Sequence, residues 1–230
     1  MPFVESWTVP MCFSAEADIV GGVVIGAIGL DVLRHVGGRR RYVVLAALPL
    51  LLAVHQLNEA FVWWGLQGHV SAEIGHLATW MYLIIAFVVL PIFMPVAILA
   101  LEPEGRPQMR MLPFVVLGIG VAGVLFAAMV RGPVTSTLAS HYIKYSTDLH
   151  AGGLVVMLYV IATCGSLLLS GIGPIARYGM VNLFAVVLLA WLNLDGFASL
   201  WCAWAAISSA LFALHLRYAE AAPLLRESVA

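Results

Sequence analysis

Four polar residues interrupt the second of the long apolar runs in this sequence. They are His55, Gln56, Asn58 and Glu59. On a helix, His55, Glu59 and Trp63 follow one another at four-residue intervals, so their side chains share one face. An ionisable pair is costly at membrane depth, and its presence there indicates a functional site. This stretch is therefore where we expect the chemistry of the protein.

The residue types are compatible with several activities. Imidazole and carboxylate groups suit Zn²⁺ or a similar divalent ion. Glu59 would then be the catalytic carboxylate, with Gln56 and His55 orienting or co-ligating it, and a metal-bound water could attack a lipid ester or amide. Alternatively, Glu59 captures a proton, a cation or a small molecule without catalysis, as in a sensor or transporter component. A structural hydrogen bond between His55 and Glu59 explains the pair equally well, and haem ligation would need a second mid-membrane histidine that is not evident.

We expect His55, Gln56 and Glu59 to form an outward-facing polar pocket, and further candidates come from segments expected at the same membrane face. One of three histidines would complete a metal site with His55 and Glu59, and four residues would contact a small ligand. Alternatively, these histidines lie in or next to solvated loops and the tryptophan belongs to an ordinary interfacial belt. The histidines are His76, His141 and His150, and the ligand-binding residues are Gln56, Asn58, Trp63 and Asp195.

The composition indicates the environment in which these residues lie. The chain has 230 residues, of which 63% are hydrophobic and 10% charged, and its mean hydropathy is +1.01. Soluble domains have about 25% charged residues, so this sequence predicts a protein embedded in a lipid bilayer. The net charge of −1 disfavours nucleic acid as a partner.

The apolar runs predict an all-α bundle of seven transmembrane helices. We expect spans at about residues 17–36, 42–65, 76–101, 111–130, 151–170, 175–194 and 198–217. Residues 1–16 would form an extracytoplasmic tail, residues 17–217 the transmembrane domain and residues 218–230 a cytoplasmic tail. Pro91 and Pro95 predict a kink in the third span. The connection at 131–150 is long enough to be functional.

Basic residues predict the orientation. In the seven-span arrangement nine lie on one side, namely Arg34, Arg39, Arg40, Arg41, Arg106, Arg110, Arg177, Arg217 and Arg226. Only Arg131 and Lys144 lie on the other. The positive-inside rule then places the N-terminus outside and the C-terminus in the cytoplasm of a bacterial inner membrane. The expected seventh span contains no lysine for a Schiff base, so we expect no retinal.

Small residues leave two questions open. Gly22 and Gly26 have GxxxG spacing, which allows close approach of another helix, either within the chain or in a homo-oligomer. Cys12 and Cys202 fall on the same side, so a disulfide between them is an open alternative.

The beginning of the chain resembles an uncharacterised family of bacterial multi-pass membrane proteins. The resemblance rests on the motif Met11-Cys12-Phe13-Ser14-Ala15 and on Gln56-x-x-Glu59 followed by Trp63. It implies that Met11 is the true start rather than Met1, and it gives weight to Gln56 and Glu59. His55 stands where such proteins carry glutamine. The family brings no known activity.

Overall fold

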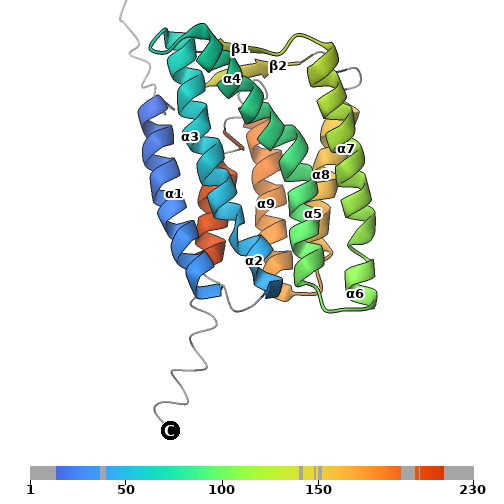
Figure 1. Cartoon of the computed structure of the whole chain (residues 1–230). Coiled ribbons are helices and arrows are strands. Elements are labelled where there is room, and N and C mark those ends of the chain that lie inside the picture. The colour runs from blue at the N-terminus through green and yellow to red at the C-terminus, as the bar shows by residue number, and fades with distance from the viewer. Residues whose placement is uncertain are drawn as a thin grey trace, which may run out of the picture.

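The protein is a bundle of long helices that run up and down between two ends (Figure 1). The computed structural model describes residues 14–36, 40–139, 142–147, 149, 152–192, 200–201 and 203–214. Its helices are α1 (Ala15–Val36), α2 (Arg40–Ala46), α3 (Leu48–Gln67), α4 (Ala72–Leu83), the π-helix η1 (Ile84–Val89), α5 (Leu90–Leu101), α6 (Arg106–Met109), α7 (Leu112–Arg131), α8 (Gly152–Leu168) and α9 (Gly173–Leu192). A further helix, here called the C-terminal helix, includes Ala203–Leu214.

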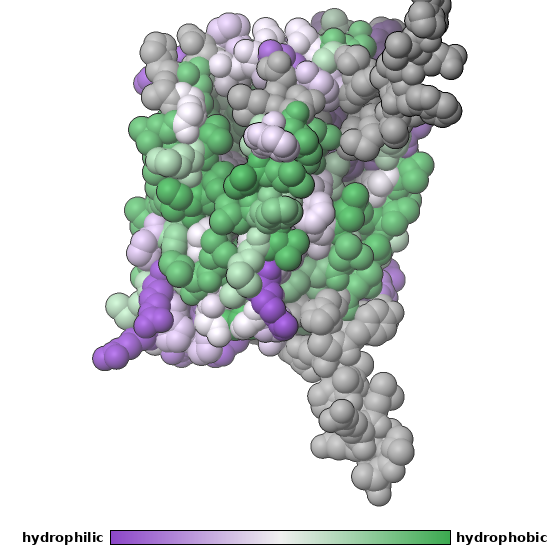
Figure 2. Space-filling view, turned by 180° about the vertical axis from the view of Figure 1, so that it is seen from behind, coloured by the Kyte–Doolittle hydropathy of each residue, from purple (hydrophilic) through white to green (hydrophobic). Residues whose placement is uncertain are grey.

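The surface is that of a membrane protein. Within the described residues, five helical segments are long and apolar enough to cross a bilayer, and the helices Gly152–Leu168 and Ala203–Leu214 are shorter but also apolar. Figure 2 shows apolar side chains across the middle of one face, with polar side chains gathered towards the ends. The mainly helical class is therefore confirmed and the apolar helices indicate a membrane protein, whereas the count of seven spans and the orientation stay predictions.

The two ends differ in their connections and charge. At one end, here called the basic end, α1 finishes and α9 begins, and the basic residues there include Arg34, Arg41, Arg106, Arg110 and Arg177. At the other end, here called the hairpin end, α7 is followed by the strands β1 (Thr135–Leu138) and β2 (Ile143–Ser146).

Helices α1, α3 and α4 pack closely against one another at glycine residues. A Cβ atom on Gly22 of α1 would lie 2.7 Å from the side chain of Leu57 on α3, and one on Gly29 would lie 2.9 Å from that of Leu50. Gly65 on α3 and Gly75 on α4 are closer still, since a Cβ on Gly65 would lie 2.4 Å from the Cα of Gly75. The glycine face of the first span therefore packs within the chain, against the helix that carries the candidate site.

The prolines of α5 lie next to an irregular helical segment. Where Pro91 and Pro95 predict a kink, the structure has the π-helix η1 immediately before α5. Such a segment leaves backbone groups without their usual helical partners, and the Tyr159 hydroxyl of α8 donates to the Ala86 carbonyl at 2.8 Å. A neighbouring helix thus compensates the irregularity, as a bilayer requires.

A β-hairpin interrupts the otherwise helical structure of the described residues. Strands β1 and β2 pair antiparallel, with Thr135 opposite Ser146 and Leu138 opposite Ile143, across the top of the bundle in Figure 1. Ile143 is completely buried and belongs to the same apolar cluster as Trp63 and Tyr82. The described residues of the long connection predicted at 131–150 therefore include a β-hairpin that covers this end of the bundle.

Candidate functional site

Polar and aromatic side chains meet below the hairpin, all of them buried except the partly buried Tyr145. They come from α1, α3, α4 and β2, and we call them the buried polar cluster: Asp18, His55, Gln56, Glu59, Trp63, Tyr82 and Tyr145. His55 is 0% exposed, Glu59 1% and Asp18 1%. Three of the four α3 members were predicted to share a face, and all four are buried together.

Asp18 connects the first helix to the third. Its Oδ1 atom accepts a hydrogen bond of 2.6 Å from Nε2 of Gln56, and Trp63 lies beside the same carboxyl group. The glycine face holds α1 and α3 close enough for this short polar contact. Asp18 therefore shares the site with the Gln-x-x-Glu motif, one helix away.

Aromatic rings connect Glu59 to His55. The Tyr145 hydroxyl donates to Oε1 of Glu59 at 3.4 Å, and the Tyr145 ring stacks on Tyr82 with centroids 4.2 Å apart and planes at 10°. Tyr82 in turn stacks on His55, with centroids 4.1 Å apart and planes at 26°. The hairpin thus contacts Glu59 directly through the Tyr145 hydroxyl. It is connected to His55 indirectly, through the stacked rings of Tyr145 and Tyr82.

Some polar atoms of the cluster have no hydrogen-bond partner within the described part of the chain. These atoms are Oδ2 of Asp18, Oε1 of Gln56 and Nε1 of Trp63. Buried polar groups are rarely left without partners, and an uncompensated buried carboxylate costs several kcal/mol, to order of magnitude. Donors and acceptors are therefore available there for a proton, a cation or a water molecule.

Two other predicted site residues lie apart from these atoms. Asn58 faces the next helix, where its Nδ2 atom donates to the Ala78 carbonyl at 2.8 Å. His76 is exposed, and its Nε2 atom accepts the indole N–H of Trp80 at 3.1 Å. The contacts of Asn58 join α3 to α4, and those of His76 lie within α4.

The remaining predicted ligands fall outside the described residues. These are Asp195, His141 and His150, as are both cysteines of the suggested disulfide, Cys12 and Cys202. Among the residues that are described, no group of three His, Cys, Asp or Glu side chains could hold a metal ion. The divalent-metal site therefore stays a prediction that depends on the undescribed histidines.

Three members of the cluster, Asp18, Tyr82 and Tyr145, are not among the site residues predicted from the sequence. Asp18 lies one turn inside an apolar helix, and this position of a carboxyl group could have indicated a functional residue. The two tyrosines come together through stacking between elements about 60 residues apart, which leaves no pattern in the sequence.

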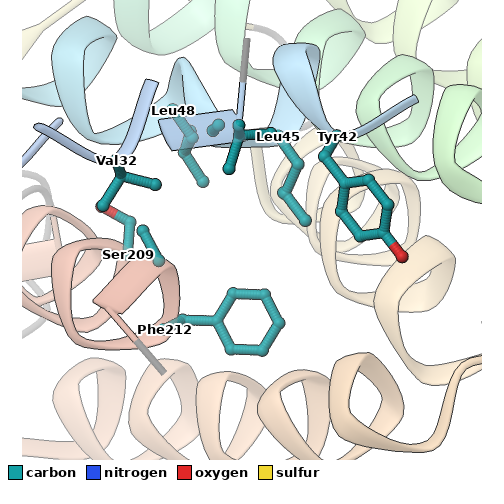
Figure 3. Close-up of a pocket in the computed structure, with 9 residues that line it drawn as sticks. Val32, Tyr42, Leu45, Leu48, Ser209 and Phe212 are labelled. Carbon is teal, nitrogen blue, oxygen red and sulfur yellow. The ribbon is translucent and has the colours of Figure 1, made fainter. Parts of the chain in front are cut away.

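Cavities elsewhere differ in character. Figure 3 shows a hollow at the basic end, surrounded by Val32, Tyr42, Leu45, Leu48, Ser209 and Phe212. It holds about 10 Å³ and its lining is mainly apolar, so it is a packing space with room for a single water at most. A larger pocket of about 290 Å³ lies at the hairpin end beside His76, Thr79 and Ser136. There the Thr79 and Ser136 hydroxyl groups are 3.1 Å apart.

A further buried carboxyl group lies at the basic end. Glu102, directly after α5, is 1% exposed. Its Oε1 atom accepts from the Ser170 hydroxyl at 2.5 Å and from the Gly171 N–H at 2.8 Å. These bonds fasten the end of α5 to the turn between α8 and α9.

Comparison with known proteins identifies the family of this chain. Residues 11–226 match the model of a family of unknown function, DUF6629. No curated protein and no solved structure matches the chain. The predicted membership in an uncharacterised family is confirmed: the chain belongs to DUF6629.

Proposed function

We propose that this member of DUF6629 binds a cation, in the simplest case a proton, at the buried polar cluster, and that it acts without catalysis as a sensor or transporter component. Asp18 and Glu59 would share the bound charge. Gln56 would orient Asp18, and Tyr145 would orient Glu59.

One observation carries the proposal: the carboxyl group of Asp18 is 1% exposed in an apolar bundle, and its hydrogen-bonding neighbours among the described residues are the neutral side chains of Gln56 and Trp63. The ion pairs of His35 with Asp31 and of Arg41 with Glu104 do not involve Asp18. Removing a carboxylate from water without compensation is strongly unfavourable. A bound proton or cation would remove this penalty.

The proposal includes a seven-span topology in a bacterial inner membrane, with α8 and the C-terminal helix as the two short spans. The basic end would face the cytoplasm because it carries most of the arginines, whereas Arg131 and Lys144 lie towards the hairpin end. The buried polar cluster would then lie in the outer half of the membrane, under the hairpin.

Cation binding fits the described residues better than metal-dependent hydrolysis. A hydrolytic zinc site needs about three protein ligands and an open coordination position. The cluster offers His55, Glu59 and Asp18, yet these do not form a group able to hold a metal, and His55 stacks against Tyr82. A proton requires only one carboxyl oxygen, which Asp18 provides.

The test uses the full chain in lipid nanodiscs and dicyclohexylcarbodiimide, which reacts with protonated carboxyl groups in apolar surroundings. We expect an adduct on Asp18 or Glu59, found by peptide mass mapping, that diminishes as the pH is raised. Asp18→Asn and Glu59→Gln remove the respective reactive group. Glu104, whose side chain is 83% exposed, is the internal control for nonspecific labelling.

Two results would contradict the proposal. One is labelling of Asp18 and Glu59 no greater than that of Glu104 at every pH. The other is about one equivalent of zinc in gently purified wild-type protein that is lost in Glu59→Ala, which would instead support the divalent-metal site.

A further inference from the structure

A groove opens on the outside of the bundle between α9 and the C-terminal helix. It holds about 380 Å³, and the residues that matter for its chemistry are Arg177, Tyr178, Val181, Trp204, Ser208 and Leu211. This groove is remote from the buried polar cluster in sequence and shares no residue with it. Its occupant is therefore a separate question from the proposed cation site.

Both walls of the groove carry side chains suited to hydrocarbon. Val181 is 53% exposed and Leu211 is 63% exposed, and both lie on helices apolar enough to contact a bilayer. The base is fixed, because the Tyr178 hydroxyl lies 3.1 Å from that of Ser208 and the Tyr178 ring stacks on Phe212 with centroids 4.5 Å apart. The groove is thus a preformed track between two helices.

Arg177 supplies a positive charge at one end of this track. It lies four residues into α9, about 6 Å along the helix axis from Gly173, at the basic end. Its side chain is exposed and forms no ion pair with a described residue. Guanidinium groups bind phosphate in a bidentate manner, and basic pockets between membrane helices bind lipid headgroups.

We infer that this groove binds an anionic phospholipid, with its phosphate on Arg177 and an acyl chain along Val181, Trp204 and Leu211. A soluble anion would use Arg177 but leave the apolar wall uncovered. A neutral lipid chain would cover the wall but leave the guanidinium without an anion. A phospholipid combines both features in the order that the groove presents them.

Native mass spectrometry of the full chain, released from nanodiscs, measures lipid retention. The probes are phosphatidylglycerol and phosphatidylcholine with identical acyl chains. We expect wild-type protein to retain phosphatidylglycerol preferentially and Arg177→Gln to reduce this preference about fivefold. Arg110→Gln is the matched control, since Arg110 is an exposed arginine at the same end that does not line the groove.

Equal losses in Arg177→Gln and Arg110→Gln would overturn the inference, because they would show a diffuse charge effect. A photoreactive phenylalanine analogue at position 181 tests the acyl track directly. A lipid adduct would support the inference, whereas a crosslink to residues 218–230 would overturn it by showing that the chain's own tail fills the groove. Unchanged thermal unfolding of both arginine variants excludes misfolding as the cause.

Discussion

Two buried carboxyl groups at opposite ends of the bundle have different surroundings. Glu102 is bound to a turn: one oxygen accepts from the Ser170 hydroxyl and the Gly171 N–H, and Ser170 also accepts from the Ile172 N–H at 3.2 Å. Asp18 accepts a hydrogen bond from the side chain of Gln56 and lies beside Trp63. The second oxygen of Glu102, Oε2, has no hydrogen-bond partner among the described residues. The first carboxyl group accepts a hydrogen bond from the backbone of a turn, whereas the second accepts one from a side chain of another helix.

This difference separates structure from function. Removing Glu102 would release a turn that joins three helices, so its burial has a direct structural use. Asp18 holds no turn in place, and α1 is already packed on α3 through Gly22 and Gly29. A buried charge that the packing does not need is better explained by a bound ligand.

The largest expected effect is on Glu102. Glu102→Ala leaves the Ser170 hydroxyl and the Gly171 N–H without their acceptor, so we expect a loss of about 2–4 kcal/mol in the free energy of unfolding. Reversible unfolding in mixed micelles measures it. Glu102→Gln keeps an acceptor oxygen and should recover a large part of the loss; an alanine variant as stable as wild type would mean that Glu102 does not fasten the turn.

Asp18→Asn should have the opposite character. The amide oxygen still accepts from Gln56 and no charge remains to be neutralised, so we expect a change of at most about 1 kcal/mol, and a gain is allowed. The same measurement in mixed micelles applies, together with carbodiimide labelling, which should be lost at position 18. A loss of stability as large as that of Glu102→Ala would mean that Asp18 has a structural role, as Glu102 does.

Tyr145→Phe tests how the hairpin contacts the site. The hydrogen bond to Glu59 is long, at 3.4 Å, so its loss should cost only about 0.5–1 kcal/mol, while the ring stacking on Tyr82 is kept. We expect faster carbodiimide labelling of Glu59 without a change at Asp18. Tyr145→Ala, which also removes the stacking, is the companion variant and should accelerate labelling further; equal rates in all three proteins would show that the hairpin does not control access.

The smallest expected effect concerns an exposed ion pair at the same end as Glu102. Arg41 and Glu104 are 3.2 Å apart, with side chains 57% and 83% exposed. Arg41→Gln should therefore change stability by no more than about 0.5 kcal/mol in thermal or chemical unfolding. A larger loss would mean that end charges, and not burial, account for the effect of Glu102.

The sequence predicted the helices well because each apolar run is long and ends at charges, glycine or proline. The four-residue spacing of His55, Glu59 and Trp63 likewise predicted that they share one face, and the structure shows that this face is buried. The β-hairpin was missed, although Thr135 and Ile143 begin short segments rich in residues typical of strands.

The partners of the predicted face could not be found in the same way. Asp18 sits on a different helix, and only the packing of Gly22 against Leu57 brings it to Gln56. Tyr82 and Tyr145 meet through the fold of the hairpin over the bundle. The periodicity of polar and apolar residues describes one helix at a time, so it does not predict contacts between different elements.

The stack of Tyr145 on Tyr82 gives the hairpin an optical signature of its own. Near-ultraviolet circular dichroism depends on fixed aromatic packing, and these rings lie nearly parallel at 4.2 Å. Separation of the hairpin from the bundle would break that arrangement while leaving the helices intact. Opening of the cover over Glu59 could thus be followed in unlabelled protein as a loss of near-ultraviolet signal at constant far-ultraviolet signal.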